Sequence, residues 1–488
     1  MLRKRKTGSC FGYLTVYLTL VMTVLLSLCL TLIEGARSNA IRVETECVTE
    51  IGLNSILAEY HRELLTQFNL FAIDSSYGTS ASGVEDITQH LREYLERNLS
   101  LEDVLLSDYL YRDFLAITVD LVELKGASIL TDGNGAVFRR RAAEAMKDDC
   151  NLVLLQDLQQ WLQVIEDHGL TERDVAAEKK AVDEQLQAYN GREIQIAENV
   201  WSTVQVQNPT CQLEDIRKKG ILEYVVENVD ELSAKSLHPD DFISQRIAQG
   251  QVNCGNLPAD TLTDSETLAE RFFFQEYLLR YLGHYGTEKE AGAMDYQVEY
   301  LLANKDSDVA NLKWVVNVIC AIREASNAVY LFSDTEKCME AEVIATLLTA
   351  LLQVPELAAL LKTALLLGWA YAESLYDVEV LLNGGRIPLI KDKSSWHYDI
   401  ESALHLKKNS ETTSAGGLSY EDYLRILMMF TDIDALTCRI MDMVEADIRL
   451  TPGNSFFRLD NCYDQVAFYV RVKSKYGYQY ELSRSKKY

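Results

Sequence analysis

Two absences define the N-terminal part of this 488-residue chain. Residues Phe11 to Ile33 contain no charged side chain, and no proline occurs before Pro209. Proline interrupts helices because it lacks an N–H and its ring clashes with the preceding turn. A helix can therefore run through this region without a break, and about 20 apolar residues are enough to cross a hydrocarbon layer of ~30 Å. Residues 11–33 are predicted to form a transmembrane helix.

Catalytic and ligand-binding motifs are absent as well. The sequence has no G-x-S-x-G, H-E-x-x-H, G-x-x-x-x-G-K or G-x-G-x-x-G, the spacings that build a nucleophile elbow, a zinc pair or a phosphate cradle. Ten cysteines are scattered without a C-x-x-C pair, which argues against a disulfide scaffold. We therefore expect a non-enzymatic protein with no catalytic residue, cofactor or metal site. Cys10 and Cys29 lie in or beside the apolar run, and most of the other eight cysteines are expected to be buried free thiols, with one or two bridges among them allowed.

Basic residues are scarce relative to acidic ones. The chain has 47 Lys and Arg against 73 Asp and Glu, a formal charge of −26, and such a surface repels nucleic acid, so no nucleic-acid partner is expected. Four basic residues, Arg3 to Lys6, precede the apolar run without any acidic residue. By the positive-inside rule, residues 1–10 are cytoplasmic and the bulk of the chain is extracellular, with the cell membrane as its location.

A second basic cluster lies at the C-terminal end. Two interpretations stay open for it: it binds an anionic cell-wall polymer, or its lysines protect an exposed edge strand from pairing with other chains. Its members are Arg471, Lys473, Lys475, Arg484, Lys486 and Lys487.

Two alternatives to a retained, specialised span also stay open. A cleavable secretory signal has the same basic start, and Ser38 to Ala40 could form its cleavage site, but its apolar region is usually about 7–15 residues. A plain single-pass anchor has the same apolar length as the segment observed here. The retained span is the interpretation that the length of residues 11–33 favours.

Helical periodicity continues beyond the apolar run. Apolar residues recur at spacings of three and four, so we expect one helix from Tyr13 to Phe68, in which residues 34–69 form an extracellular stalk. We expect one face of this stalk to pack on the body of the protein; its residues are Ala40, Val43, Cys47 and Ile51. The membrane half and its outer boundary are expected to contact lipid or neighbouring subunits through Tyr17, Leu20, Val24, Leu28, Glu34 and Arg37.

The rest of the chain is predicted to be α+β and predominantly helical. We expect a small α/β unit at residues 70–149, a large helical domain at 150–446, and a C-terminal β-hairpin with a basic tail at 447–488. Strand patterns occur early, at residues 70–73 and in two strands that meet at Gly126, and late, in a hairpin around Gly477. Because an isolated hairpin is marginally stable, the early and late strands should form one small mixed sheet against the stalk.

Two features are expected within the helical domain. The apolar stretch 341–375 is divided at Pro355, so it should form two buried helices instead of a second span. Ser419 and Asp422 have the spacing of a capping box at the start of another helix.

Several stretches carry a family resemblance: GYLTVYLTL at Gly12, IEGARSNAIR at Ile33, AEYHRELLTQFNLF at Ala58, DYQVEYLLANKDSDVANLKWVV at Asp295, IREASNAVYL at Ile322, WAYAESLYDVEVLLNGGRIPL at Trp369 and LSYEDYLRIL at Leu418. In these the chain resembles an uncharacterised family of low-GC Gram-positive bacteria related to the TadE/TadG-like pseudopilins of Tad (type IVc) pili. Glu34 to Arg37 is similar to the Glu-x-x-Arg that follows the span in TadE-like proteins. The sequence departs from a processed prepilin at Tyr17, where Glu would stand if the chain were cut after Gly12.

The resemblance implies a pilin-like stalk and a function. The implied function is a non-enzymatic, membrane-anchored extracellular component of a Tad-type pilus or secretion machine, with the lipid bilayer and other subunits as partners. The alternative is a single-pass surface binding or sensory protein unrelated to pili.

Overall fold

A computed structural model describes residues 10–80, 83–100, 114–150, 152–197, 200–204, 210–226, 228–237, 242–251, 267–287, 289, 292–350, 355–406 and 416–488. The chain divides into two compact units. The first consists of Met1–Gly133, Val252–Leu262 and Gly453–Tyr488, and the second of Asn134–Gln251 and Thr263–Pro452. Both ends of the chain therefore belong to the first unit.

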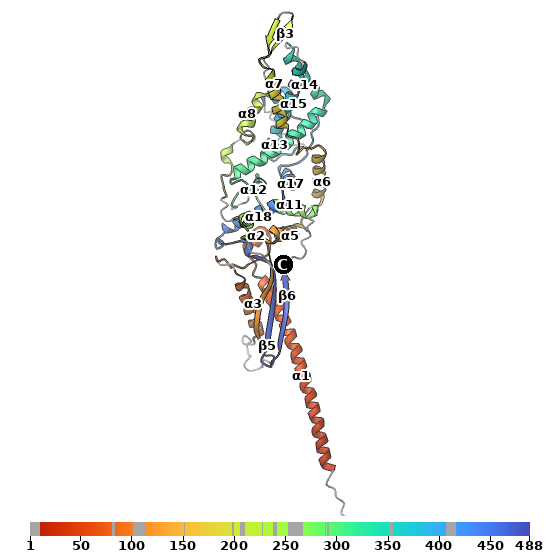
Figure 1. The fold of residues 1–488 in the computed structure, drawn as a ribbon, viewed down its shortest axis with the longest axis vertical. Helices are drawn as coiled ribbons and strands as arrows, with labels where there is room; N and C mark the ends of the chain where they lie inside the picture. The colour runs from red at the N-terminus through yellow and green to blue at the C-terminus, as the bar shows by residue number, and fades with distance from the viewer. Residues whose placement is uncertain are drawn as a thin grey trace, which may run out of the picture. The chain divides into compact units, whose positions relative to one another are not determined.

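A 48-residue helix, α1 (Cys10–Leu57), is the longest element of the first unit (Figure 1). The helix is continuous through the boundary at Ile33, as predicted, but it ends at Leu57 instead of Phe68. Tyr60 pairs with Ile73, and the His61 N–H donates to the Ala72 carbonyl over 2.9 Å. This pairing turns the chain out of the helix, and α2 (Arg62–Phe68) begins anew with the His61 ring as its N-terminal cap.

Early and late strands form one sheet, which confirms the expected pairing of the two ends of the chain. Its central strand, β5 (Cys462–Ser474), pairs with β1 (Ile73–Asp74), β2 (Ile117–Ile129) and β6 (Gln479–Lys487). All pairings in this sheet are antiparallel, so the prediction of a mixed sheet is wrong. β1, β2 and β6 all run antiparallel to β5, and antiparallel neighbours do not require the crossover connection that parallel strands need.

The early strand pattern around Gly126 forms one strand instead of two. The register of β2 against β5 shifts between Leu124 and Gly126, which marks a β-bulge. A bulge bends a strand without ending it, and glycine is often found at such positions. The predicted bend at Gly126 is therefore present, but the prediction that two separate strands meet there is wrong.

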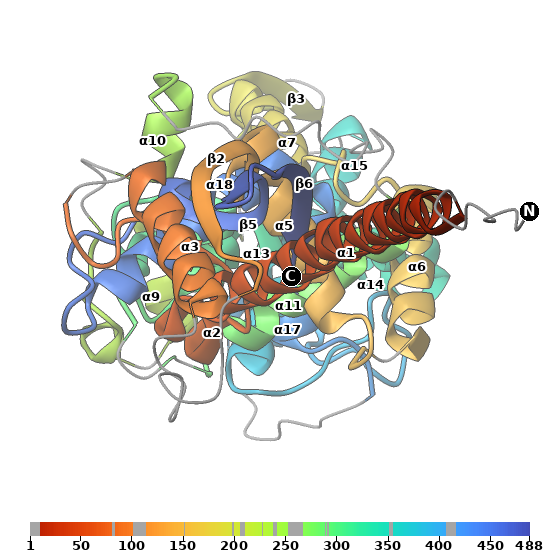
Figure 2. The ribbon, with the colours of Figure 1, turned by 90° about the horizontal axis from the view of Figure 1, so that it is seen from below.

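The second half of α1 is covered by the sheet and by α3 (Val84–Leu99). Apolar side chains from all three elements form one core, which includes Val48, Leu53, Leu91, Val466 and Val470. Figure 2, seen from below, shows α3 and the strands β2, β5 and β6 near the end of α1 that lies away from the N-terminus.

The second unit is predominantly helical, and its long helices α13 (Asp308–Ser333) and α15 (Pro355–Leu382) pack on each other. Helix α14 (Thr335–Thr349) also packs on α15, so the described residues of the stretch 341–375 form two helices, as predicted, apart from Ala350. A small hairpin, β3 (Glu193–Ala197) with β4 (Val200–Thr203), accompanies them. The other helices are α5 (Asp132–Met146), α6 (Leu152–Asp167), α7 (Val175–Tyr189), α8 (Cys211–Lys219), α9 (Leu222–Val225), α10 (Ile243–Ala248), α11 (Leu268–Tyr281), α12 (Gln297–Ala303), α16 (Ile400–His405), α17 (Tyr420–Phe430) and α18 (Ile433–Arg449).

One local prediction for the second unit is confirmed, and another is only partly correct. Ser419 and Asp422 form the reciprocal hydrogen bonds of a capping box at the start of α17. α14 is less buried than expected, however, because Met339, Val343 and Leu347 are exposed and only its small residues pack inward.

Candidate functional site

The first half of α1 is apolar and uncovered within the described part of the chain. An 18-residue window of this helix has a mean hydropathy of 2.4 and none of it is buried. Tyr17, Leu20, Val24 and Leu28 are all exposed on it. Such a helix is long and apolar enough to cross a bilayer, and it also has the composition of a signal sequence.

A second helix passes the same test of length and hydropathy. It is α13, of which 67% of the most apolar window is buried. Packing in the helical unit accounts for its apolar character, since a core helix and a membrane helix share this composition. Only α1 combines membrane-spanning length with an exposed surface among the described helices.

The face of α1 that packs on the unit differs from the predicted one. Val43 and Ile51 are 50% and 49% exposed, Cys47 is exposed and Ala40 is half-buried. The residues that are buried instead are Ile41, Thr45, Val48, Thr49, Gly52, Leu53 and Ile56. The prediction that the Val43 stripe packs on the body is therefore wrong. The packed face lies on another side of the helix and combines Ile, Val and Leu side chains with small and polar ones.

Glu34 and Arg37 both contact the turn of the C-terminal hairpin. The Tyr478 hydroxyl donates to Glu34 over 2.5 Å, and this hydrogen bond raises the pKa of Tyr478. The Arg37 guanidinium pairs with Glu34 at 3.0 Å and lies 4.0 Å from the centre of the Tyr476 ring. The Glu-x-x-Arg pair, expected at a membrane or subunit contact, thus serves to hold the hairpin within the same chain.

Hydrogen bonds continue this contact along α1. The Tyr480 hydroxyl donates to Glu46 over 2.6 Å, Lys486 pairs with Glu50, and the Tyr488 hydroxyl donates to the Leu57 carbonyl. These contacts follow the same order along β6 as along α1, so the two elements run in the same direction. The contacts with α1 extend along the whole of β6.

Several basic side chains of the tail are also paired within the first unit. Arg471 and Lys473 both pair with Asp120, at 2.5 and 2.7 Å, and Lys486 pairs with Glu50. β6 pairs with β5, and no further strand pairs with β6 in the described part of the sheet. This arrangement is consistent with lysines that protect an edge strand, and binding of a wall polymer stays a prediction.

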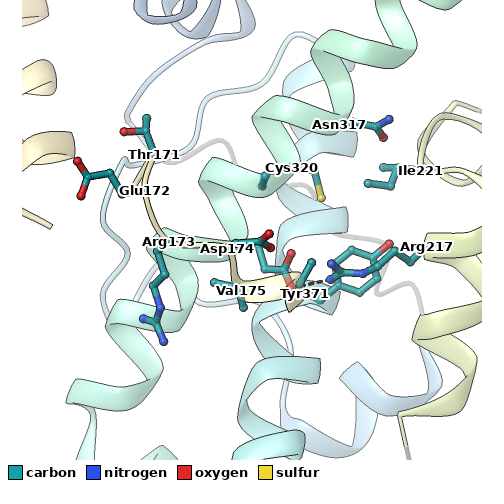
Figure 3. Close-up of a pocket in the computed structure, with 13 residues that line it drawn as sticks. Thr171, Glu172, Arg173, Asp174, Val175, Arg217, Ile221, Asn317, Cys320 and Tyr371 are labelled. Atoms are coloured by element: carbon teal, nitrogen blue, oxygen red, sulfur yellow. Dashed lines mark hydrogen bonds and ion pairs between the residues drawn. The ribbon is translucent and has the colours of Figure 1, made fainter. Parts of the chain in front are cut away.

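The second unit contains a cavity of about 350 Å³ between α7, α13 and α15 (Figure 3). The Arg217 guanidinium donates to Glu324 over 2.6 Å and lies 4.0 Å from the centre of the Tyr371 ring. Burial raises the pKa of Glu324, and the charge of Arg217 opposes that shift. Figure 3 shows Arg217 along the Tyr371 ring, whereas Arg173 and Glu172 point away from it.

Two other groups of this cavity are held in their neutral forms. Burial raises the pKa of the Cys320 thiol to about 12, and the thiol lies 3.3 Å from the Ser374 hydroxyl. The Tyr371 hydroxyl is buried without a hydrogen-bond partner among the described residues. The cavity is thus lined by two paired guanidinium groups, Arg173 and Arg217, by carboxylates and by neutral polar groups, which suits binding of a polar ligand more than nucleophilic chemistry.

A fully buried ion network lies in the same helical pair. Arg323 of α13 donates to Asp377 of α15 over 3.0 Å, and Lys391 pairs with Asp377 at 2.5 Å and with Glu373. The side chains of all four residues are 0% exposed. Removing charges from water is costly, so each must be paired and hydrogen-bonded.

The network fastens an irregular segment onto the two helices. Arg323 donates to the carbonyls of Pro388 and Leu389, over 2.9 and 2.7 Å. Glu373 accepts from the backbone N–H groups of His397 and Tyr398, over 2.8 and 3.0 Å. Sequence reasoning missed this network, although charged residues within two apolar helices were a signal for it.

Other candidate features of the sequence carry no site among the described residues. No group of three or more His, Cys, Asp or Glu side chains is placed to hold a metal there. Gly133, Asn134 and Gly135 have positive φ and lie in the first turn of α5.

No disulfide joins the seven cysteines whose side chains the structure describes. Of the six that lie outside the apolar span, Cys320 and Cys462 are buried, and the other four are half-buried or exposed. The expectation of mostly buried thiols is therefore wrong for these six, and Cys29 and Cys47 are exposed on α1.

Fold and site together define a predominantly helical protein with a small antiparallel sheet and an apolar N-terminal helix that could be a membrane anchor or a signal sequence. The chain belongs to a family of unknown function, DUF5702, whose model matches residues 199–474. This range includes the buried ion network and β5 but not α1. Comparison with curated proteins found no match, and comparison with solved structures found none either.

Proposed function

We propose that the protein is a non-enzymatic, membrane-anchored, pseudopilin-like component of a Tad-type pilus or secretion machine. Its N-terminus lies in the cytoplasm and the bulk of the chain lies outside the cell. The observation that carries the proposal is the continuity of α1, whose first half is bare and apolar and whose second half is covered by a folded unit. One rigid helix thereby joins a membrane segment to an antiparallel sheet, which is a pilin-like arrangement.

The exposed stripe of α1 supports an assembly role. Val43, Cys47 and Ile51 lie one helical turn apart on the face that the sheet and α3 leave uncovered. Apolar side chains at such spacing form a continuous strip, and burying it against another helix is favourable at about 25 cal/mol per Å². A neighbouring subunit in the same membrane is the partner proposed for this strip.

Photo-cross-linking in intact cells tests this proposal. A photoreactive phenylalanine analogue at Ile51 should give a discrete product with a second copy or with another single-span subunit. The same probe at Glu93, which is exposed on α3, is the matched control and should give no such product. Monomer alone from Ile51, or the same products from both positions, would contradict the proposal.

A pair of valine substitutions separates assembly from folding. Val43→Asp should abolish the product from Ile51 while the free energy of unfolding stays within about 0.5 kcal/mol, because Val43 is half exposed. Val48→Asp should destabilise the protein by several kcal/mol, because Val48 is buried and an unpaired charge there is costly. Thermal or chemical denaturation of the purified proteins checks both values.

The cavity of the second unit favours the alternative, a single-pass surface binding protein in which α1 is only a tether. In that case Val43→Asp would leave ligand binding in the cavity unchanged. Arg217→Met would abolish it, because Arg217 is the cavity-lining cation that is held against Glu324 and the Tyr371 ring.

A further inference from the structure

The turn between β5 and β6 lies at the level of α1 where the apolar run ends. Ile33 is the last residue of that run, and Glu34 accepts the hydrogen bond of Tyr478. One turn further along, Arg37 contacts the Tyr476 ring. These two contacts fix the end of the hairpin beside the boundary between the apolar and polar parts of the helix.

A second segment joins the hairpin at this level. The Lys475 N–H donates to the Ala116 carbonyl over 3.0 Å, and the Ser474 hydroxyl donates to the Leu115 carbonyl over 2.5 Å. Residues 114–116 therefore lie beside the turn. We call Phe114, Lys475, Tyr476 and Tyr478 the hairpin tip.

The hairpin tip has an unusual composition for an exposed end of an acidic protein. Phe114 is 69% exposed and Tyr476 is 48% exposed. Lys475 is also exposed, and no ion pair holds its ammonium group among the described residues, whereas Arg471 and Lys473 are both paired with Asp120. The tip thus combines large aromatic rings with an available cation.

Aromatic rings and lysines of this kind collect at membrane–water interfaces. Tyr places its ring in the headgroup layer with the hydroxyl toward water, and Lys extends its ammonium toward phosphate groups. A chain of charge −26 is otherwise repelled by anionic lipid, so a cationic tip beside the apolar run is complementary to that surface.

We propose that the hairpin tip rests in the headgroup layer of the bilayer that holds α1, so that the sheet sets the depth and tilt of the helix. This inference rests on the anchoring part of the proposed function and is independent of the pilus assignment. We choose lipid as the partner of the tip because the tip lies directly beside the exposed apolar surface of α1. A neighbouring protein subunit is the other occupant that the experiment must distinguish.

Depth-dependent quenching of fluorescence tests this contact in the full-length protein. The protein is placed in nanodiscs of phosphatidylcholine with phosphatidylglycerol, in which bromine is attached to acyl carbons near the headgroup. The added indole of Tyr476→Trp, measured against the wild-type background, should lose about half of its emission, and Phe114→Trp should behave in the same way. Tyr469→Trp, on β5 away from the turn, is the matched control and should lose none.

The outcomes separate this inference from the proposed function. If Cys29 is protected from water-soluble maleimide but neither tip indole is quenched, α1 is inserted and the inference is overturned. Quenching of Tyr469→Trp equal to that of the tip would also overturn it, since the sheet would then lie flat on the lipid. If Cys29 is not protected in the nanodisc, the anchoring itself fails.

Discussion

At the scale of single residues, buried carboxylates hold the irregular segments of the second unit in place. Glu373 accepts two backbone N–H groups, and Asp308 accepts those of Asp295 and Tyr296 at 3.0 Å each. The sequence shows these acids within or at the start of apolar helices, but it does not show their partners, which are backbone groups of neighbouring irregular segments. Such pairs of a helix carboxylate with loop backbone are the part of the site that sequence patterns could not predict.

The ion network gives the first prediction at this scale. Lys391→Met should destabilise the protein by about 3–5 kcal/mol, because it leaves Glu373 as a buried charge without a cation and leaves Asp377 paired with Arg323 alone. Lys393→Met is the matched control: Lys393 pairs with Glu336 on the surface and should be replaceable with little or no change. Denaturant unfolding followed by circular dichroism measures both, and equal stability of the two variants would contradict the account.

Asp442 gives a prediction for pH dependence. Burial raises its pKa from 3.8 to about 7, although the Ser244 N–H donates to it over 2.9 Å. Between these two pKa values the folded protein holds a proton that the unfolded chain has lost, so this group's contribution to stability falls as pH rises from about 4 to about 7. The slope is about 1.4 kcal/mol per pH unit.

Comparison with a variant isolates that contribution. The difference in unfolding free energy between the wild type and Asp442→Asn should decrease steadily over this pH range and stay constant above it. Asp434→Asn, at the exposed start of the same helix, should show no such trend. A difference for Asp442→Asn that is flat with pH would show that the carboxyl is ionised throughout.

At the scale of elements, the periodicity of apolar residues predicts where the long helices are. It does not predict which face of each helix packs against the rest of the protein. α1 is apolar on two sides, so the pattern alone could not distinguish the side that packs from the side left open. Thr45, Thr49 and Gly52 occupy the packed side because α3 and the sheet approach closely there. Small side chains at a close contact carry little hydrophobic signal.

The glycines of α1 test this close approach. A Cβ added at Gly52 would lie 2.9 Å from Leu91 Cδ1 and 3.3 Å from Leu95 Cδ2, both in the core. Gly52→Val should therefore destabilise the protein by about 1–3 kcal/mol through overpacking. Gly35→Val has nothing within 4 Å and should be neutral or stabilising, since glycine is a poor helix former. Similar thermal midpoints for both variants would mean that α3 does not pack on α1 at this point.

At the scale of the whole molecule, the joining of the two chain ends in one sheet was predictable, because strand patterns occur almost only near them. The place where the second unit begins was harder to predict, since the chain passes from β2 into α5 within a few residues. Its boundary falls at Gly133, whereas composition placed the change near Cys150.

Truncation tests the shared sheet. Deleting Gln465 to Tyr488 removes most of β5 and all of β6, so β2 and α1 lose the partners that cover their apolar faces. Limited proteolysis should then cut residues 83–133 as fast as an unfolded chain. Unchanged protease resistance of that segment would show that β2 is stable without β5.

The membrane topology of α1 is the central claim, and two native cysteines on this one helix test it most directly. Cys29 lies within the apolar run and Cys47 lies 18 residues further along, and both are exposed on the helix surface. The measurement is labelling of intact cells with a membrane-impermeant maleimide. The cells make the Val43→Asp variant, in which no neighbouring subunit is expected to cover Cys47. Cys29→Ser and Cys47→Ser substitutions in this variant assign the signal. The account predicts that Cys47 reacts in intact cells and that Cys29 stays unreactive until detergent dissolves the membrane. Reaction of Cys29 in intact cells, or of Cys47 only after lysis, would contradict it.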